Sequence, residues 1–320
     1  MTTADKTLQL VIAIALFGGV MVAVLVIADR ARTRRGDLFQ SLAFVLPAVL
    51  MILFGLLYPA GRTIYESFRD ANSTGFVGLD NYQTVFTDKN QLAVLRNTAV
   101  WVVLTPLAAT AIGLVYAILV DKARWERLAK ALMFLPMAIS LVGASLIWKF
   151  VYDYKGAENE QIGLLNALLK SLGLETYRFL LTEPWNTVFL IIIMVWVQAG
   201  FAMTVLSAAI RAIPDDIVEA ARLDGVNALK MFRYITVPSI RPALIVVLTT
   251  ISIATLKVFD IVRTATGGNF DTSVIAYEFY VQSFRAFNGG LGAALAVLLF
   301  VLVIPIIVYN VRQMRRMEAR

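Results

Sequence analysis

Long uninterrupted apolar runs constrain the fold of this chain more than any other feature of its sequence. Seven runs are long enough to cross a bilayer as a helix of about 20 residues, and five of them contain no Lys, Arg, Asp or Glu. The runs cover residues 8–28, 41–60, 98–120, 131–152, 186–208, 242–262 and 291–311. Hydrophobic residues make up 59% of the 320-residue chain, against about 45–50% in a typical soluble domain. Since backbone polar groups in lipid need partners within their own segment, the runs predict an all-α integral membrane protein with seven transmembrane helices.

The first run needs separate consideration, because a signal peptide also contains an apolar stretch. It has no A-x-A-like exit, and its 21 residues exceed the roughly 7–15 residues of a signal-peptide core. We therefore interpret it as a membrane anchor. The predicted domains are an N-terminal anchor with a basic cytoplasmic linker (1–40), a core that holds the other six runs (41–312), and a cytoplasmic tail (313–320).

The basic residues are divided unevenly between the two sides that seven crossings define. One side holds 17 basic and 9 acidic residues, and the other holds 10 basic and 12 acidic residues. The first side comprises segments 29–40, 121–130, 209–241 and 312–320, and the second comprises segments 1–7, 61–97, 153–185 and 263–290. Because Lys and Arg favour cytoplasmic loops, we expect the first side and the C-terminus to be cytoplasmic and the N-terminus to be external. This pattern accounts for the net charge of +7 without a nucleic-acid-binding surface.

Several classes of chemistry are excluded by what the sequence lacks. The chain has no Cys and no His, which removes disulfides, thiolate or imidazole metal sites, and catalysis by either side chain. It has no G-x-x-x-x-G-K-[ST] loop, so it cannot hydrolyse ATP by that route. A membrane-embedded enzyme would need converging titratable residues, which five of the runs lack. We predict no catalytic residue, no metal site and no cofactor bound by this chain.

A charged stretch lies between the fifth and sixth runs. Pro214 suits the first turn of a helix, and the two aspartates after it complement the positive helix end. Gly225 either ends this helix or lets another backbone approach closely. Asn227 can cap a second short helix, residues 228–236, that stops before Pro238. The pattern predicts two short helices that meet at a glycine outside the hydrocarbon; an interfacial amphipathic loop is the alternative interpretation.

The residue order in this stretch is EAA, three residues, Gly, nine residues, then Ile-x-x-Pro. It resembles the signature loop of the permease subunits of binding-protein-dependent ABC importers, with Val237 where that family usually has Leu. The resemblance implies that loop 211–239 is a coupling element that docks on an ATPase subunit. The implied coupling residues are Glu219, Ala220, Ala221, Asp224, Gly225, Ile235 and Pro238.

Further blocks extend this resemblance over residues 41–312, in the order found in sugar-type permeases. They are GLDNY at 78–82, GLLN at 163–166, and Phe259-Asp260 followed by TGG at 266–268. The insertion at 154–160 looks like that of the α-glucoside branch. The resemblance therefore implies uptake of a sugar such as a maltose- or trehalose-like α-glucoside.

The same resemblance implies a set of partners in a bacterial inner membrane. A second permease would complete a heterodimer, and two cytoplasmic ATPase subunits would hold ATP and Mg²⁺. An external solute-binding protein would dock on loops 61–97, 153–185 and 263–290. Transport would then proceed by alternating access, driven by the ATPase subunits.

The translocation path has candidates in the fifth and sixth runs. By comparison with maltose-type permeases, the path lies near Gly200, Met203 and Thr204, although the larger aromatics of the maltose protein are missing. We interpret Gly200 as a break in the helix. Gln198 either bonds to a neighbouring helix or points into the path. The candidates are Trp196, Gln198, Gly200, Met203, Thr204, Lys257 and Asp260.

Charges and proline inside the runs carry their own expectations. Lys257 and Asp260 are three residues apart, so on one helix they share a face and can pair. They form either a snorkelling pair or part of the path lining. Pro136 is expected to kink the fourth run. Trp148 fits an interfacial aromatic belt, with sugar stacking as the alternative.

Two other transport functions stay open at this point. An importer of glycerol phosphate or another polar solute would favour extra Arg or Lys in the path, and Lys257 is the deep candidate. A stand-alone secondary transporter would need no ATPase and often shows inverted repeats. The sequence shows no convincing repeat, which favours the importer.

Overall fold

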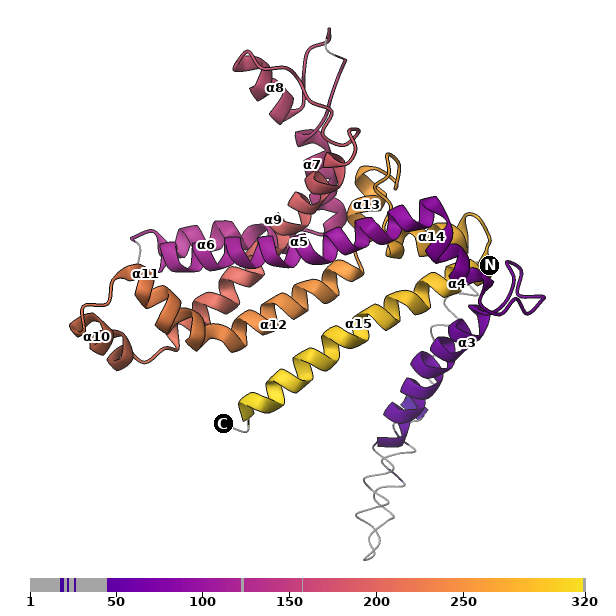
Figure 1. Ribbon diagram of the computed structural model, residues 1–320, viewed down its shortest axis with the longest axis horizontal. Helices are drawn as coiled ribbons and strands as arrows, with labels where there is room; N and C mark the ends of the chain where they lie inside the picture. The colour runs from indigo at the N-terminus through magenta and orange to yellow at the C-terminus, as the bar shows by residue number, and fades with distance from the viewer. Residues whose placement is uncertain are drawn as a thin grey trace, which may run out of the picture. The chain divides into compact units, whose positions relative to one another are not determined.

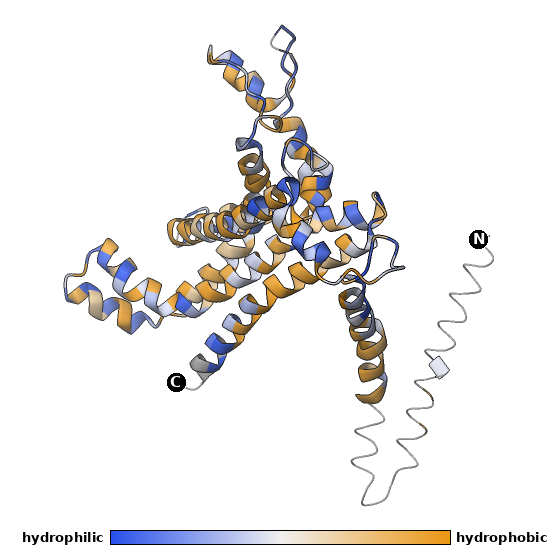
Figure 2. Cartoon of the chain, turned by 45° about the vertical axis from the view of Figure 1, so that its right-hand side comes forward, coloured by the Kyte–Doolittle hydropathy of each residue, from blue (hydrophilic) through white to orange (hydrophobic). Residues whose placement is uncertain are grey.

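The computed structural model describes residues 18, 19, 22, 26, 45–121, 124–156 and 158–318. The described part is helical and contains no strand, apart from an isolated antiparallel bridge between Arg69 and Phe76 (Figure 1). The chain divides into two compact units, Met1–Tyr65 and Glu66–Arg320. Figure 2 shows that apolar residues dominate the long helices, while polar residues concentrate in the segments between them.

The helix Val45–Glu66, which belongs to the first unit except for its last residue, is long and apolar enough to span a membrane. It contains a π-helical turn, η1 (Leu53–Leu57), followed by α3 (Tyr58–Glu66). This helix corresponds to the predicted span 41–60. The predicted span 8–28 lies outside the described residues, apart from four positions.

The second unit holds four further single helices of spanning length and one bent helix pair. The single helices are α5 (Lys89–Val120), α9 (Trp185–Arg211), a continuous helix ending in α12 (Val237–Leu256), and α15 (Gly289–Glu318). Short helices connect them: α4 (Asp80–Thr87), α8 (Leu164–Ser171), α10 (Asp215–Leu223), α13 (Asp260–Ala265) and α14 (Ile275–Phe284). The described residues thus contain five single spans, or six with the bent pair, so the predicted number of seven is not confirmed.

The bent pair replaces the predicted single span 131–152. α6 (Glu126–Phe134) ends in a 3-10 turn, η2 (Leu135–Ala138), and α7 (Leu141–Val151) leaves at 104°. Pro136 lies in that turn, as expected from its missing N–H. The Ser140 side chain accepts a hydrogen bond from the Gly143 N–H at 3.1 Å and so caps α7. The proline therefore marks a complete break, where the sequence had indicated a kink.

The sixth predicted span is shorter than expected and ends at Leu256. Lys257 is the C-terminal cap of α12, and Asp260 begins the separate helix α13. Phe259, between them, has a φ of −132°, which no α-helix allows. Lys257 is exposed and Asp260 half-buried, and no ion pair joins these two described residues. The prediction that they share a helix face is wrong, because the helix stops before it reaches Asp260.

Close packing of α5 on α9 forms the centre of the second unit. A Cβ atom on Gly113 of α5 would lie 2.5 Å from the Cβ of Ala202, 2.7 Å from the backbone N of Met203 and 3.0 Å from the carbonyl O of Ala199. Small residues at such a crossing let two backbones approach, which is how helices associate where lipid supplies no hydrophobic driving force. Gly113 is therefore required by tertiary contact and not by its backbone conformation.

This contact predicts the effect of one methyl group. Gly113→Ala should lower the melting temperature of the detergent-purified chain, because overpacking costs about 1–3 kcal/mol. Gly61→Ala in α3 is the matched control, since nothing lies within 4 Å of its Cβ position. Alanine should there only improve helix propensity, by about 1 kcal/mol. Equal melting temperatures for both variants in a thermal denaturation assay would contradict the packing.

Candidate functional site

A helical hairpin, residues 214–231, projects from one end of the second unit (Figure 1). Pro214 precedes its first helix, α10, and Asp215 and Asp216 lie in the first turn, where carboxylates complement the helix dipole. This start agrees with the sequence-based expectation. The hairpin lies between the C-terminal end of α9 and the helix that becomes α12.

Gly225 ends α10 by adopting a left-handed conformation, with a φ of +76°. Its N–H donates to the Arg222 carbonyl at 3.0 Å, and the Val226 N–H donates to the Ala221 carbonyl at 3.0 Å. This pair of bonds is a Schellman motif, which satisfies the last carbonyls of the helix. Nothing in the chain lies within 4 Å of a Cβ on Gly225. Of the two predicted roles, terminating the helix is therefore the one found within this chain.

The second arm of the hairpin starts as predicted but does not stop as predicted. The Asn227 side chain accepts a hydrogen bond from the Lys230 N–H at 2.9 Å and caps α11 (Ala228–Met231). A π-helical turn, η3 (Phe232–Thr236), then joins α11 directly to α12. Pro238 lies near the start of α12 and does not end a helix. The wider π turn provides the space that a proline ring needs next to the preceding carbonyls.

The structure brings five of the seven predicted coupling residues together on α10 and its cap. Ala221 is buried, whereas Glu219, Ala220, Asp224 and Gly225 are exposed. Ile235 is half-buried and Pro238 exposed, and both lie after the hairpin, in η3 and at the start of α12.

Two apolar side chains complete this surface, and they were not among the residues predicted from the sequence. Leu223 is 88% exposed and Leu229 is 73% exposed. Their only signal in the sequence is that they are leucines in a charged segment. The hairpin therefore presents two largely exposed leucines on the same short segment as the exposed Glu219 and Asp224.

A cavity of about 370 Å³ separates the hairpin from the ends of α5 and α9. Ile118 and Asp121 of α5 and Ile210 of α9 line one side, and Arg222 and Val226 line the other. The hairpin is therefore connected to the rest of the unit at its two ends, which we call its stems: the C-terminal end of α9 and the start of η3. The cavity lies between the hairpin and the helices behind it.

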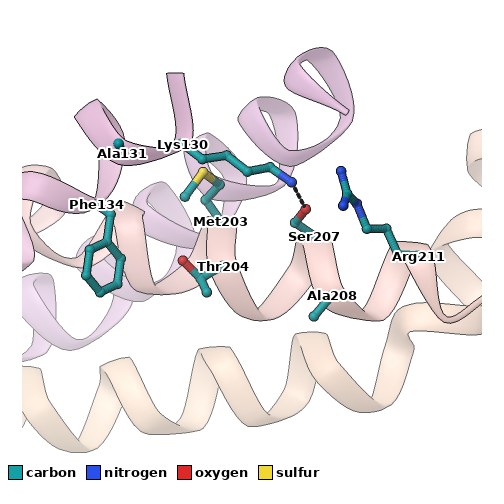
Figure 3. Close-up of a pocket in the computed structure, with 8 residues that line it drawn as sticks. All are labelled: Lys130, Ala131, Phe134, Met203, Thr204, Ser207, Ala208 and Arg211. Carbon is teal, nitrogen blue, oxygen red and sulfur yellow. Dashed lines mark hydrogen bonds between the residues drawn. The ribbon is translucent and has the colours of Figure 1, made fainter. Parts of the chain in front are cut away.

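A second cavity, of about 430 Å³, lies beside the stem of the hairpin between α6 and α9 (Figure 3). Met203 and Thr204, two of the predicted path residues, contribute to its wall. Met203 is almost completely buried, and the Thr204 hydroxyl donates to the Gly200 carbonyl at 2.8 Å. The lining residues are Lys130, Ala131, Phe134, Met203, Thr204, Ser207, Ala208 and Arg211.

Gly200 is not a break in the helix, which corrects the sequence-based interpretation. α9 continues without interruption from Trp185 to Arg211. A Cβ on Gly200 would lie 2.4 Å from the Met133 carbonyl O and 3.2 Å from the Phe134 Cα. The glycine is present because α6 approaches α9 there, and the sequence alone does not reveal this neighbour.

The other predicted path residues do not line this cavity. Trp196 packs edge-on against Trp148, with ring centroids 5.8 Å apart. Gln198 is half-buried and forms no side-chain hydrogen bond with the described residues. Lys257 and Asp260 lie beyond the end of α12. The seven candidates therefore do not form one site within this chain.

At the other end of the unit, buried amides hold the loop between α13 and α14. The Asn97 side chain donates to the carbonyls of Asp271 (2.6 Å) and Ser273 (3.1 Å), and Asn186 donates to Phe270 (2.6 Å). Phe270 and Asp271 have positive φ values of 55°, a conformation that non-glycine residues adopt only when surrounding bonds enforce it. Asn186 was not predicted; its signal is a polar residue at the start of an apolar run.

Gly267 and Gly268 also have positive φ values, of +62° and +73°. The TGG block therefore forms a turn after α13. No group of three or more Asp or Glu side chains that could hold a metal occurs among the described residues.

Comparison with known proteins agrees with this arrangement. A family model described as the inner membrane component of binding-protein-dependent transport systems matches residues 94–317. The osmoprotective compounds uptake permease protein GgtC of Synechocystis sp. is 48% identical over 275 residues, covering 86% of this chain and 99% of the relative. The α-glucoside transport system permease protein AglF of Rhizobium meliloti is 43% identical over 274 residues, covering 85% and 82%.

A solved structure supports the same fold. A chain of a bacterial ABC transporter for import of the acidic polysaccharide alginate superposes with a TM-score of 0.74 at 23% identity, covering 88% of this chain and 96% of the other. The resemblance inferred from the signature loop is thus confirmed. The chain belongs to the family of inner-membrane components of binding-protein-dependent transport systems.

Proposed function

We propose that this chain is a permease subunit of an ATP-driven importer that moves an α-glucoside sugar across the bacterial inner membrane by alternating access. The observation that carries the proposal is the 43% identity to an α-glucoside permease, combined with an exposed hairpin in a chain that has no ATP-binding loop. A maltose- or trehalose-like oligosaccharide fits this class. A trehalose/maltose permease of Thermococcus litoralis is 30% identical over 285 residues.

In this proposal the hairpin couples transport to ATP hydrolysis. Loop 211–239 would dock on an ATPase subunit, which holds the ATP and Mg²⁺. Leu223 and Leu229 would bury their exposed surface in that contact, and Glu219 would provide a charged anchor. Gly225 shapes the turn between the two arms, and the continuous helix from α11 into α12 would transmit the displacement. Two ATPase subunits and a second permease, in a heterodimer, would complete the assembly.

An external binding protein would deliver the sugar to loops 61–97, 153–185 and 263–290. The folded state of these loops supports a docking role. The Asn81 side chain donates to the carbonyls of Ser67 (2.9 Å) and Arg69 (2.7 Å). Asn166 donates to the carbonyls of Asp153 (2.9 Å) and Tyr177 (3.0 Å). With these three loops outside the cell, the C-terminus would lie inside and the N-terminus outside. Residues 1–40 would form an additional anchor before the core.

The alternatives are less well supported. A stand-alone secondary transporter would not need the family's binding protein, and the family match covers residues 94–317. Import of glycerol phosphate or another polar solute would favour a cluster of Lys or Arg in the path. Among the seven predicted path residues the one cation is Lys257, at the end of α12. Lys130 and Arg211, which line the cavity beside Met203 and Thr204, are paired with carboxylates, so a neutral sugar fits better.

Charge reversal at Glu219 and a new charge at Gly225 test the coupling. Glu219→Lys and Gly225→Asp should leave the chain in the membrane at wild-type levels but abolish ATP-driven uptake of radiolabelled maltose, trehalose or sucrose into vesicles that contain the whole importer. Gly225→Asn is the control for the turn, because asparagine tolerates positive φ with about the same volume as aspartate. It should retain more uptake than Gly225→Asp. Normal uptake by both Glu219→Lys and Gly225→Asp would remove the coupling role.

Lys257 provides a separate test of the path. Lys257→Ala should change the KM or maximal rate of sugar uptake more than it changes the amount of protein in the membrane, because the exposed ammonium at the end of α12 would face the translocated solute. Lys257→Arg keeps the positive charge and should behave more like the wild type. If Lys257→Ala transports with unchanged kinetics, this lysine has only a structural role.

A further inference from the structure

A network of charged side chains joins three helix ends at the stem of the hairpin. Arg211, the last residue of α9, donates through Nε to Asp121 Oδ1 at 3.0 Å and through Nη2 to Glu126 Oε1. Glu126 Oε1 also pairs with Lys130 Nζ at 2.8 Å. The ammonium of Lys130 in turn donates to Ser207 Oγ at 2.5 Å (Figure 3). Two carboxylates and two cations therefore balance each other at one point.

The network lies where three helices end or begin, next to the hairpin. Asp121 caps the C-terminal end of α5, Glu126 lies in the first turn of α6, and Arg211 closes α9. Three residues, 212–214, separate Arg211 from the first residue of α10. Arg211 is thus the last charged side chain before the hairpin that bonds to other helices, and Ile213, two residues later, packs against the hydrophobic core. Arg211 connects the end of α9 to residues 85 and 90 positions earlier in the sequence.

The cavity behind the hairpin increases the contribution of the Arg211 ion pairs to holding the hairpin in place. The cavity of about 370 Å³ lies between the hairpin and the ends of α5 and α9, and Ala221 is the one buried residue of α10. Few packed side chains therefore brace the first arm. Lys130 and Arg211 also line the 430 Å³ cavity that Met203 and Thr204 line. The Asp121, Glu126 and Lys130 side chains are only about a fifth exposed (18%, 21% and 23%), whereas the Arg211 side chain is 51% exposed. A network of partly buried charges is held more firmly than an isolated surface pair.

We propose that Arg211 is a positioning residue of the transport cycle. It fixes the α9 stem of the hairpin to α5 and α6, so that a displacement of α10 reaches the wall of the cavity beside Met203 and Thr204 instead of being absorbed by the linker. This role rests on the proposed importer function. Its chemistry requires a guanidinium, because one planar fork must reach two carboxylates on different helices at once.

The first experiment needs no solute. Hydrogen–deuterium exchange is measured on the purified chain in detergent, for the wild type, Arg211→Gln and Arg312→Gln. Arg312 is an exposed arginine of α15 that forms no ion pair with the described residues, so its substitution removes the same charge elsewhere. Amides of residues 212–225 should exchange faster in Arg211→Gln alone. Equal exchange in all three proteins would overturn the positioning role.

The second experiment measures coupling in the whole importer, purified through a tag on this chain and reconstituted in liposomes. Arg211→Gln should increase the ATP hydrolysed per molecule of maltose, trehalose or sucrose imported by about fivefold or more. Arg211→Lys, which keeps the charge but not the fork, should lie between Arg211→Gln and the wild type. Asp121→Asn should raise the ratio too, and adding it to Arg211→Gln should have little further effect.

The possible results distinguish a failure of the Arg211 positioning role from a failure of the proposed sugar-import function. If the wild type imports sugar with ATP and Arg211→Gln loses uptake and ATP hydrolysis in equal proportion, Arg211 has only a structural role and the inference is wrong. If the wild type imports none of the three sugars with ATP present, the proposed sugar-import function is wrong. The exchange experiment still decides whether Arg211 fixes the hairpin in that case.

Discussion

The requirement that every backbone polar group in a bilayer find a partner governs the rest of this structure. It confines the spanning segments to helices and limits irregular backbone to places where side chains or caps complete the bonding. The break after Pro136 is closed by the Ser140 cap. The loop after α13 is held by the amides of Asn97 and Asn186. In both places, specific polar side chains complete the bonding of an irregular backbone.

Close packing holds the spanning helices α5, α6 and α9 against one another. Gly113 and Gly200 let α5 and α6 approach α9 more closely than any side chain would allow. α9 is thereby fixed along its length and ends at Arg211, directly before the hairpin. The hairpin itself is small, exposed and hollow behind. A force applied to it can reach the spans through its two stems, the charged network at Arg211 and the continuous helix into α12.

Much of this architecture follows from the sequence, because the relevant signals are local. The apolar runs identify the five single spans of the described residues, Pro136 marks the position where the fourth run breaks, and Pro214, Gly225 and Asn227 delimit the hairpin. The predictions failed where the cause is tertiary. Gly200 looks like a helix breaker until α6 is placed against it, and no local signal ends α12 before Lys257.

In the candidate site, too, local features could be predicted from the sequence and tertiary contacts could not. The helix start, glycine turn and asparagine cap of the signature loop could be predicted, since these signals lie within one short segment. The coupling roles of its residues stay a prediction. The contact of Arg211 with Asp121 spans 90 positions, and both residues look like ordinary flanking charges in the sequence. The outer path candidates Lys257 and Asp260 failed as a pair because their shared face assumed an unbroken helix.

The most direct measurement of the central claim uses the absence of cysteine from the natural chain. Single cysteines replace Leu223 on the hairpin and, as the control, Phe287, which is 74% exposed in the segment before α15. A membrane-impermeant maleimide is applied to inside-out vesicles with and without the bound ATPase subunits. The account predicts that Leu223→Cys is labelled only after the ATPase is removed, while Phe287→Cys is labelled only from the opposite face. Equal labelling of Leu223→Cys in both states would contradict docking through the hairpin.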